Sequence, residues 1–143
     1  MADADITRSR AIAQQVARLA ALCRLTLSAV EDRHNYGGKM QSPMSDVQVS
    51  ILAIGRLVEQ INHLPGADSA LERAPAGDAW LQISGLTGIL DARAWRLLGE
   101  HAEAVPACDL ADMEHGLRYL AELAERVSAA MQFEDNTEGT HHA

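Results

Sequence analysis

The sequence predicts an all-α protein, and three observations support this prediction. Ala and Leu dominate the composition, and aromatic residues make up only 3% of the 143 residues. Such an excess of strong helix formers favours helices over strands. Apolar residues recur at alternating steps of three and four, which is the period of an amphipathic helix. Gly, Asn and Pro separate these periodic segments. We therefore expect an antiparallel up-down-up-down four-helix bundle.

Four helices are expected, at about 3–32, 45–64, 79–104 and 109–133. They would form a single bundle domain over residues 1–133, which is long enough to bury a core without disulfides. Residues 134–143 are polar and are expected to form a flexible tail.

Each of the first two helices carries one apolar face. The face of the first comprises Ile12, Val16, Leu19, Cys23, Thr26 and Val30. The face of the second comprises Val47, Ile51, Ile54, Val58 and Ile61. Pro65 and Gly66 end the second helix, because Pro cannot continue a helix and Gly tolerates a left-handed cap. The segment 67–77 that follows is predicted to be a polar connection.

The third helix contains two glycines. Its inner face is expected to include Ile83, Leu86, Leu90, Leu97 and Leu98. Gly85 and Gly88 each cost a helix roughly 1 kcal/mol relative to Ala. The segment Ser84–Gly88 is therefore a candidate kink.

The fourth helix carries an unbroken heptad seam of Leu110, Met113, Leu117, Leu120, Ala124, Val127 and Met131. It overlays the second helix at a constant offset of 66 residues, so that Ile51 meets Leu117 and Ile61 meets Val127. Two repeated α-hairpins that arose by duplication would produce this match. Any two amphipathic helices whose heptads are in phase would produce it as well.

Charge and cysteine content limit the class of protein. The net charge of −8 argues against sequence-independent binding to nucleic acid or to an anionic membrane. Cys23 and Cys108 form no disulfide framework, and the opening MADADITRSR has acids where a signal peptide needs basic and then apolar residues. We therefore predict a cytoplasmic location.

The stretch from Glu31 to Pro43, EDRHNYGGKMQSP, gathers many of the reactive side chains. Its glycines do not follow the order of a phosphate-binding loop, so we interpret it as a connection that ends the first helix. It contains one of two pairs in which an acid precedes a histidine by three residues, a spacing used by di-iron bundles. These metal candidates are Glu31, His34, Asp112 and His115. The heptad phase places Asp112 and His115 outside the seam, so no metal site is predicted.

No nucleophile is seen beside an organised base, so neither catalytic residues nor a cofactor are predicted. The function we expect is that of a non-enzymatic interaction or regulatory bundle, which forms a homodimer or docks onto a larger protein. Its interaction surface would include Tyr36 and apolar residues beyond the core seams, Leu27, Leu52 and Leu57. The acidic fourth helix would add Glu114, Glu122 and Glu125.

Two alternatives remain open. One is a metal- or small-ligand-binding bundle, with or without enzymatic activity. Its ligand pocket would be lined by Trp80, Gly85, Gly88 and Trp95. The other is an acidic mimic of nucleic acid, which would need carboxylates spaced along one exposed face of the fourth helix.

Overall fold

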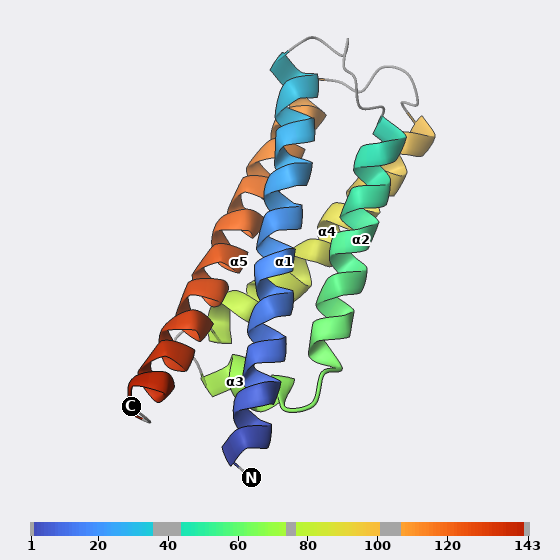
Figure 1. Ribbon diagram of the computed structural model, residues 1–143. Coiled ribbons are helices and arrows are strands. Elements are labelled where there is room, and N and C mark those ends of the chain that lie inside the picture. The colour runs from blue at the N-terminus through green and yellow to red at the C-terminus, as the bar shows by residue number, and fades with distance from the viewer. Residues whose placement is uncertain (1, 36–43, 74–76, 101–106, 142–143) are drawn as a thin grey trace.

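The described part of the chain folds into five α-helices packed together, as the computed structural model shows (Figure 1). The structure describes residues 2–35, 44–73, 77–100 and 107–141. The helices are α1 (Ala2–Asn35), α2 (Met44–Asn62), α3 (Ala67–Arg73), α4 (Gly77–Glu100) and α5 (Ala107–His141). These residues contain no strand, so the prediction of an all-α protein is confirmed.

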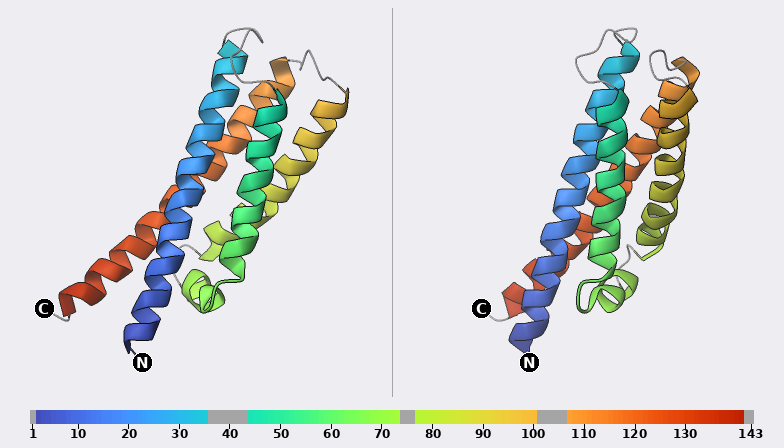
Figure 2. Two further views of the ribbon diagram at one scale, coloured as in Figure 1. Left: turned by 45° about the vertical axis from the view of Figure 1, so that its right-hand side comes forward. Right: turned by 90° about the vertical axis from the view of Figure 1, so that its right-hand side faces the viewer.

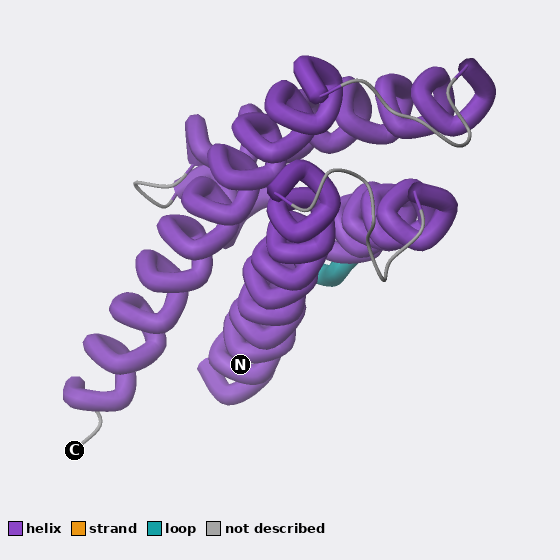
Figure 3. The backbone as a smooth tube through the Cα atoms, turned by 90° about the horizontal axis from the view of Figure 1, so that it is seen from above, coloured by secondary structure: helices purple, strands orange, loops and turns teal. Residues whose placement is uncertain are grey.

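The four long helices alternate in direction. In Figure 1, α1 and α4 ascend whereas α2 and α5 descend. Seen from above, α1 and α2 form one layer and α4 and α5 the other (Figure 3). In the described ranges, the backbones of α1 and α4 each lie close to those of both α2 and α5, whereas the backbone of α1 does not lie close to that of α4, nor that of α2 to that of α5. The lower end of α5 diverges from α1 (Figure 2). Each long helix therefore has two long neighbours and one outward side.

The prediction of an irregular connection over 67–77 was wrong, because its first seven residues form α3. Gly66 has a φ of 79°, the left-handed conformation that ends the preceding turn and lets the chain start a new helix. Ala67 and Leu71 are four residues apart and both are buried. These two residues and the partly buried Ala70 hold α3 against α1, α2 and α4.

The core is aliphatic and receives side chains from all five helices. Every residue predicted for the inner faces of the first, second and fourth helices is buried. On α4, Ile83 and Leu90 are buried as predicted, whereas Leu86 is only partly buried. Thr87 takes the inner position instead, because it lies four residues after Ile83 and three before Leu90. Leu97 and Leu98 have side chains outside the described part of the chain.

The candidate kink at Ser84–Gly88 does not divide the helix, because α4 is continuous from Gly77 to Glu100. The polar side chains of this stretch bond back to the helix. Thr87 donates to the Ile83 carbonyl at 2.6 Å, and Ser84 donates to the Trp80 carbonyl at 3.2 Å. Burial of the α4 inner face offsets the low helix propensity of the two glycines.

The fifth helix is longer than the sequence predicts. The fourth predicted helix ends at 133, but α5 continues through the expected tail to His141. No proline interrupts this stretch, and helix extension adds one hydrogen bond per residue once a helix is formed. The flexibility of residues 134–143 stays a prediction. So does the duplication, because the buried pairs Ile51 with Leu117 and Ile61 with Val127 also follow from heptad phase alone.

Candidate functional site

Helix α4 carries a second, exposed apolar strip opposite its buried face. The residues Leu81, Gly85, Gly88, Ala92 and Trp95 follow one another at steps of four and three, and all are exposed. We call these five residues the outer seam. Leu81 is 71% exposed and Trp95 is 53% exposed. Ile89 lies beside the seam and is 69% exposed. Leu81, Ile89 and Trp95 therefore lie outside the core, unlike the buried residues next to them on α4.

The middle of the outer seam is formed by small residues. A Cβ atom added to Gly85 or Gly88 would meet no heavy atom within 4 Å. The backbone of α4 is therefore open to the outside over this stretch. Another helix could approach it more closely than side chains normally permit.

Charged residues flank the outer seam at its two ends. Asp78 and Arg96 are both exposed and lie 18 residues apart. This separation is about five turns of helix, so both side chains lie on the same side of the seam. The acid is near the start of α4, and the base is near its end.

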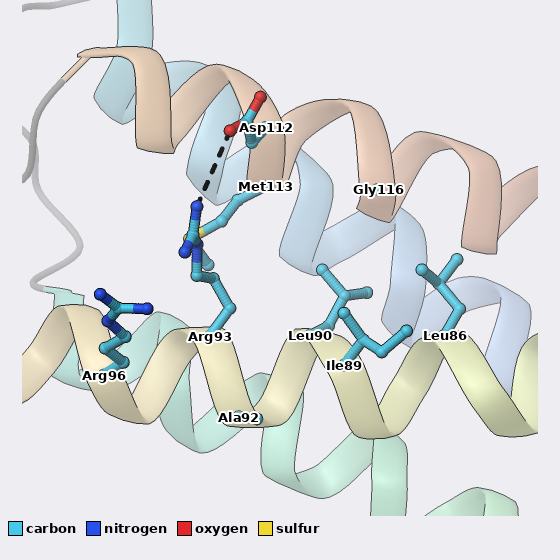
Figure 4. Close-up of a pocket in the computed structure, with 9 residues that line it drawn as sticks. All are labelled: Leu86, Ile89, Leu90, Ala92, Arg93, Arg96, Asp112, Met113 and Gly116. Carbon is cyan, nitrogen blue, oxygen red and sulfur yellow. Dashed lines mark ion pairs between the residues drawn. The ribbon is translucent and has the colours of Figure 1, made fainter.

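A mainly apolar pocket of about 460 Å³ lies between α4 and α5 (Figure 4). Its lining comprises Leu86, Ile89, Leu90, Ala92, Arg93, Arg96, Asp112, Met113 and Gly116. Gly116 creates part of this space, because a Cβ there would lie 3.1 Å from Leu90 Cδ2. Arg93 rises from α4 toward α5, where it pairs with Asp109 at 3.5 Å and Asp112 at 4.0 Å. The pocket is thus apolar along its length and charged at one end.

A more polar hollow of about 400 Å³ lies on the other side of α4, against α2. Its lining comprises Leu52, Gly55, Arg56, Val58, Glu59, Asn62, Ser84, Thr87, Gly88 and Asp91. Asp91 Oδ1 is buried there without a hydrogen-bond partner. The indole N–H of Trp80 donates to Oδ1 of Asn62, a residue that lines the hollow, at 2.8 Å, and this bond joins α4 to α2.

Ion pairs join α1 to α5 on the opposite side of the molecule. Arg24 contacts both carboxylate oxygens of Glu125, at 2.8 and 2.6 Å. These hydrogen bonds hold the pKa of Glu125 below its ordinary value. Arg118 contacts Glu31 at 3.0 Å and Glu114 at 2.8 Å. Two of the three acids predicted for the interaction surface, Glu114 and Glu125, therefore pair inside the chain. Glu125 is nevertheless exposed, as is Glu122.

The metal candidates that the structure describes do not form a group. Glu31 pairs with Arg118, and Asp112 lies beside Arg93 with a side chain that is 70% exposed. His115 is exposed on α5, and the side chain of His34 is outside the described part. Among the residues that the structure describes, no three acids, histidines or cysteines are grouped closely enough to hold a metal ion.

The four residues predicted to line a ligand pocket are not together in either the α4–α5 pocket or the α2–α4 hollow. Trp80 is buried with 6% exposure, and it lines neither the α4–α5 pocket nor the α2–α4 hollow. Gly88 lines the hollow, whereas Gly85 and Trp95 are exposed on the outer seam.

The apolar residues predicted for the interaction surface differ in how exposed they are. Leu27 is 3% exposed and belongs to the core, so its place on the surface was wrong. It follows Cys23 by four residues and precedes Val30 by three, which puts it on the inner face of α1. Leu52 and Leu57 are half-buried. Tyr36 lies outside the described residues.

Leu81, Ile89 and Ala92 were missed as surface residues by the sequence reasoning. The signal was present as a second series of apolar and small residues at steps of four and three. That series interleaves with the buried one on the same helix.

No protein-family model matches the chain, and no curated protein or solved structure matches it. Within the described ranges, none of the helices has the length and apolar content needed to cross a bilayer.

Proposed function

We propose that this chain is a non-enzymatic interaction protein in which α4 presents the outer seam to a helix of a partner protein. The scaffold is an antiparallel up-down-up-down four-helix bundle of α1, α2, α4 and α5, with α3 in one connection. The alternating helix directions and the lack of diagonal contacts between the described helices support this topology.

The observation that carries the proposal is the concentration of exposed apolar side chains on one helix. Of the six large hydrophobic residues exposed in the described ranges, three lie on α4: Leu81, Ile89 and Trp95. The other three are distributed singly over α1, α2 and α5. Single exposed apolar residues are ordinary, whereas a contiguous strip marks a surface that is covered in a complex.

The shape of the strip indicates a helical partner. Large side chains stand at both ends of the outer seam, two turns from its centre, and small residues lie between them. A helix laid along this face would bury Leu81 and Trp95 while its backbone approached the glycines closely.

Site-specific photo-crosslinking in the cells that make the protein tests this proposal. A photoreactive residue at position 92 lies on the outer seam, and one at the exposed Ala21 on α1 is the matched control. We expect a discrete covalent adduct from position 92 that is absent from position 21. The adduct should disappear when Leu81→Glu is added. Equal labelling at both positions, or an adduct unaffected by Leu81→Glu, would contradict the proposal.

A second candidate function is the binding of a small apolar molecule that carries one negative charge. The α4–α5 pocket favours it, because a volume of about 460 Å³ falls in the range of small-molecule sites. Leu86, Leu90 and Met113 would hold the apolar body. The ligand carboxylate would take the place of Asp112 beside Arg93, with Arg96 on the same rim.

Titration with a fluorescent medium-chain fatty acid tests this second function. Gly116→Leu places a side chain in the pocket, whereas Gly85→Leu adds the same side chain outside it. Saturable binding that is lost only in Gly116→Leu would support the site. Equal binding by both variants would exclude it.

A further inference from the structure

We propose that the partner at the outer seam is a second copy of this chain. The two α4 helices would pack antiparallel, with the two-fold axis passing near Gly88. This inference rests on the proposed function and names the partner for the same surface.

The order of residue sizes along the outer seam is symmetric about Gly88. Leu81 lies seven residues before it and Trp95 lies seven residues after it. In an antiparallel pair centred there, Leu81 faces Trp95 of the partner subunit, and Trp95 faces the partner's Leu81. Gly85 and Ala92, the other small residues, also face each other across the interface. A surface that complements itself in this way is what an isologous dimer requires.

The charged flank of the seam is complementary under the same operation. The two-fold axis lies perpendicular to both helices, so the flank of α4 that carries Asp78 and Arg96 lies beside the same flank of the partner subunit. Arg96 therefore falls beside the partner's Asp78, and Asp78 falls beside the partner's Arg96. The midpoint of these two positions is residue 87, one residue from the centre that Leu81 and Trp95 define. The apolar and the charged feature thus place the two-fold axis within one residue of each other along α4.

Ile89 on the same flank lies next to the two-fold axis. It would face the partner's Ile89, which accounts for a large apolar side chain that is 69% exposed in the single chain. All three exposed apolar side chains of α4 are covered by this one arrangement.

The contact is small for a stable interface. Stable interfaces bury about 800 Å² per partner. A single helix pair of about four turns lies at or below this size, so we expect a dissociation constant on the order of micromolar.

Charge-swap variants of the full chain test the proposal by sedimentation equilibrium. Arg96→Asp and Asp78→Arg should each weaken the dimer by roughly tenfold, because each replaces two attractive contacts per dimer by repulsive ones. The double variant should return the dissociation constant to within about twofold of wild type, because the attraction is restored with its sign reversed. Arg18→Asp, on the exposed side of α1, is the matched control and should leave the constant unchanged.

Disulfide trapping tests the register directly. In a Cys108→Ser background, Gly88→Cys places two thiols at the two-fold axis, where they should form a disulfide on mild oxidation. Gly85→Cys is the control, because its two copies would be about 9 Å apart along the helices, beyond the reach of a disulfide. Equal trapping at both positions would overturn the proposed register.

The two proposals fail in different ways. A purified chain that stays monomeric at several hundred micromolar, while position 92 still crosslinks to another protein in cells, would overturn the self-association and leave the proposed function standing. A dimer that ignores both charge swaps would overturn the α4–α4 arrangement. A monomer that also gives no seam-specific adduct would remove both proposals.

Discussion

Replacing the open glycines of α4 by alanine should stabilise the single chain. Gly in a helix interior is less favourable than Ala by about 1 kcal/mol. A Cβ on Gly85 or Gly88 would meet no heavy atom within 4 Å, so no steric penalty opposes this gain. We expect each substitution to raise the free energy of unfolding by about 0.8 kcal/mol and the melting temperature by about 3 °C.

Two other helical glycines give matched comparisons. The Cβ of Gly55→Ala would lie 3.4 Å from Thr87 Cγ2, close to ordinary contact, so most of the gain should remain. The Cβ of Gly116→Ala would lie 3.1 Å from Leu90 Cδ2. Leu90 is buried, and overpacking of a core costs typically about 1–3 kcal/mol. Gly116→Ala should therefore be neutral or destabilising.

Urea denaturation followed by circular dichroism measures these differences. The variants should be compared in a Leu81→Glu background, so that self-association does not add to the measured stability. A loss of stability in Gly88→Ala, or an equal gain in Gly116→Ala, would refute the reasoning. A gain in the free energy of unfolding would mean that Gly85 and Gly88 weaken α4 and contribute nothing to the fold of the single chain. Their role would then be on the outer seam.

The remaining predictions concern the core and its borders. A thiol reagent should label only the exposed Cys108 in the native chain, and both cysteines after unfolding, because Cys23 is buried and burial raises its pKa to about 12. The Cys23 thiol of the unfolded chain has its ordinary pKa of 9.0, so it loses its proton at a lower pH than the folded one. The free energy of unfolding should therefore fall above pH 9, by up to about 1.4 kcal/mol per pH unit. Urea unfolding of Cys23→Ala at several pH values should lack this slope. Glu125→Gln should lower stability by less than about 1 kcal/mol, since the Arg24 pair is half-exposed, and the effect should vanish in high salt. In the wild type that contribution is present above the ordinary pKa of a glutamate, and it is lost as pH falls through the lowered pKa of Glu125. Asn62→Leu should cost about 1–2 kcal/mol in thermal unfolding, because it leaves the Trp80 indole N–H buried without its acceptor, and an unchanged melting temperature would show that this bond contributes nothing.

Periodicity predicted the inner faces of three long helices because each has one clear apolar strip. It misplaced part of α4, where apolar and small residues occur on two opposite faces. Leu86 and Thr87 are neighbours, and hydrophobicity favours Leu86, yet the packing phase set by Ile83 and Leu90 buries Thr87. Helix α3 was missed because its apolar pattern is short, with only Ala67, Ala70 and Leu71 packed against the core.

The candidate site was harder to predict than the fold. Trp80 and Trp95 looked equivalent in sequence, but they are 15 residues apart on α4 and lie on different sides of the helix. Trp80 is buried toward α2, and Trp95 points outward. Glu125 of α5 looked like a free acid in the sequence because its partner, Arg24, is 101 residues away in the chain. Contacts of this kind depend on which helices become neighbours, and hydrophobic period does not contain that information.

The exposure of Trp95 provides the most direct measurement of the central claim. Trp80 is 6% exposed and Trp95 is 53% exposed, so acrylamide should quench mainly Trp95 in the single chain. We predict that quenching decreases as the concentration of the wild-type protein rises through the micromolar range, because the partner's Leu81 covers Trp95. Leu81→Glu should show no such decrease. Quenching of the wild type that stays constant up to several hundred micromolar would contradict the pairing of α4 with a second copy of itself.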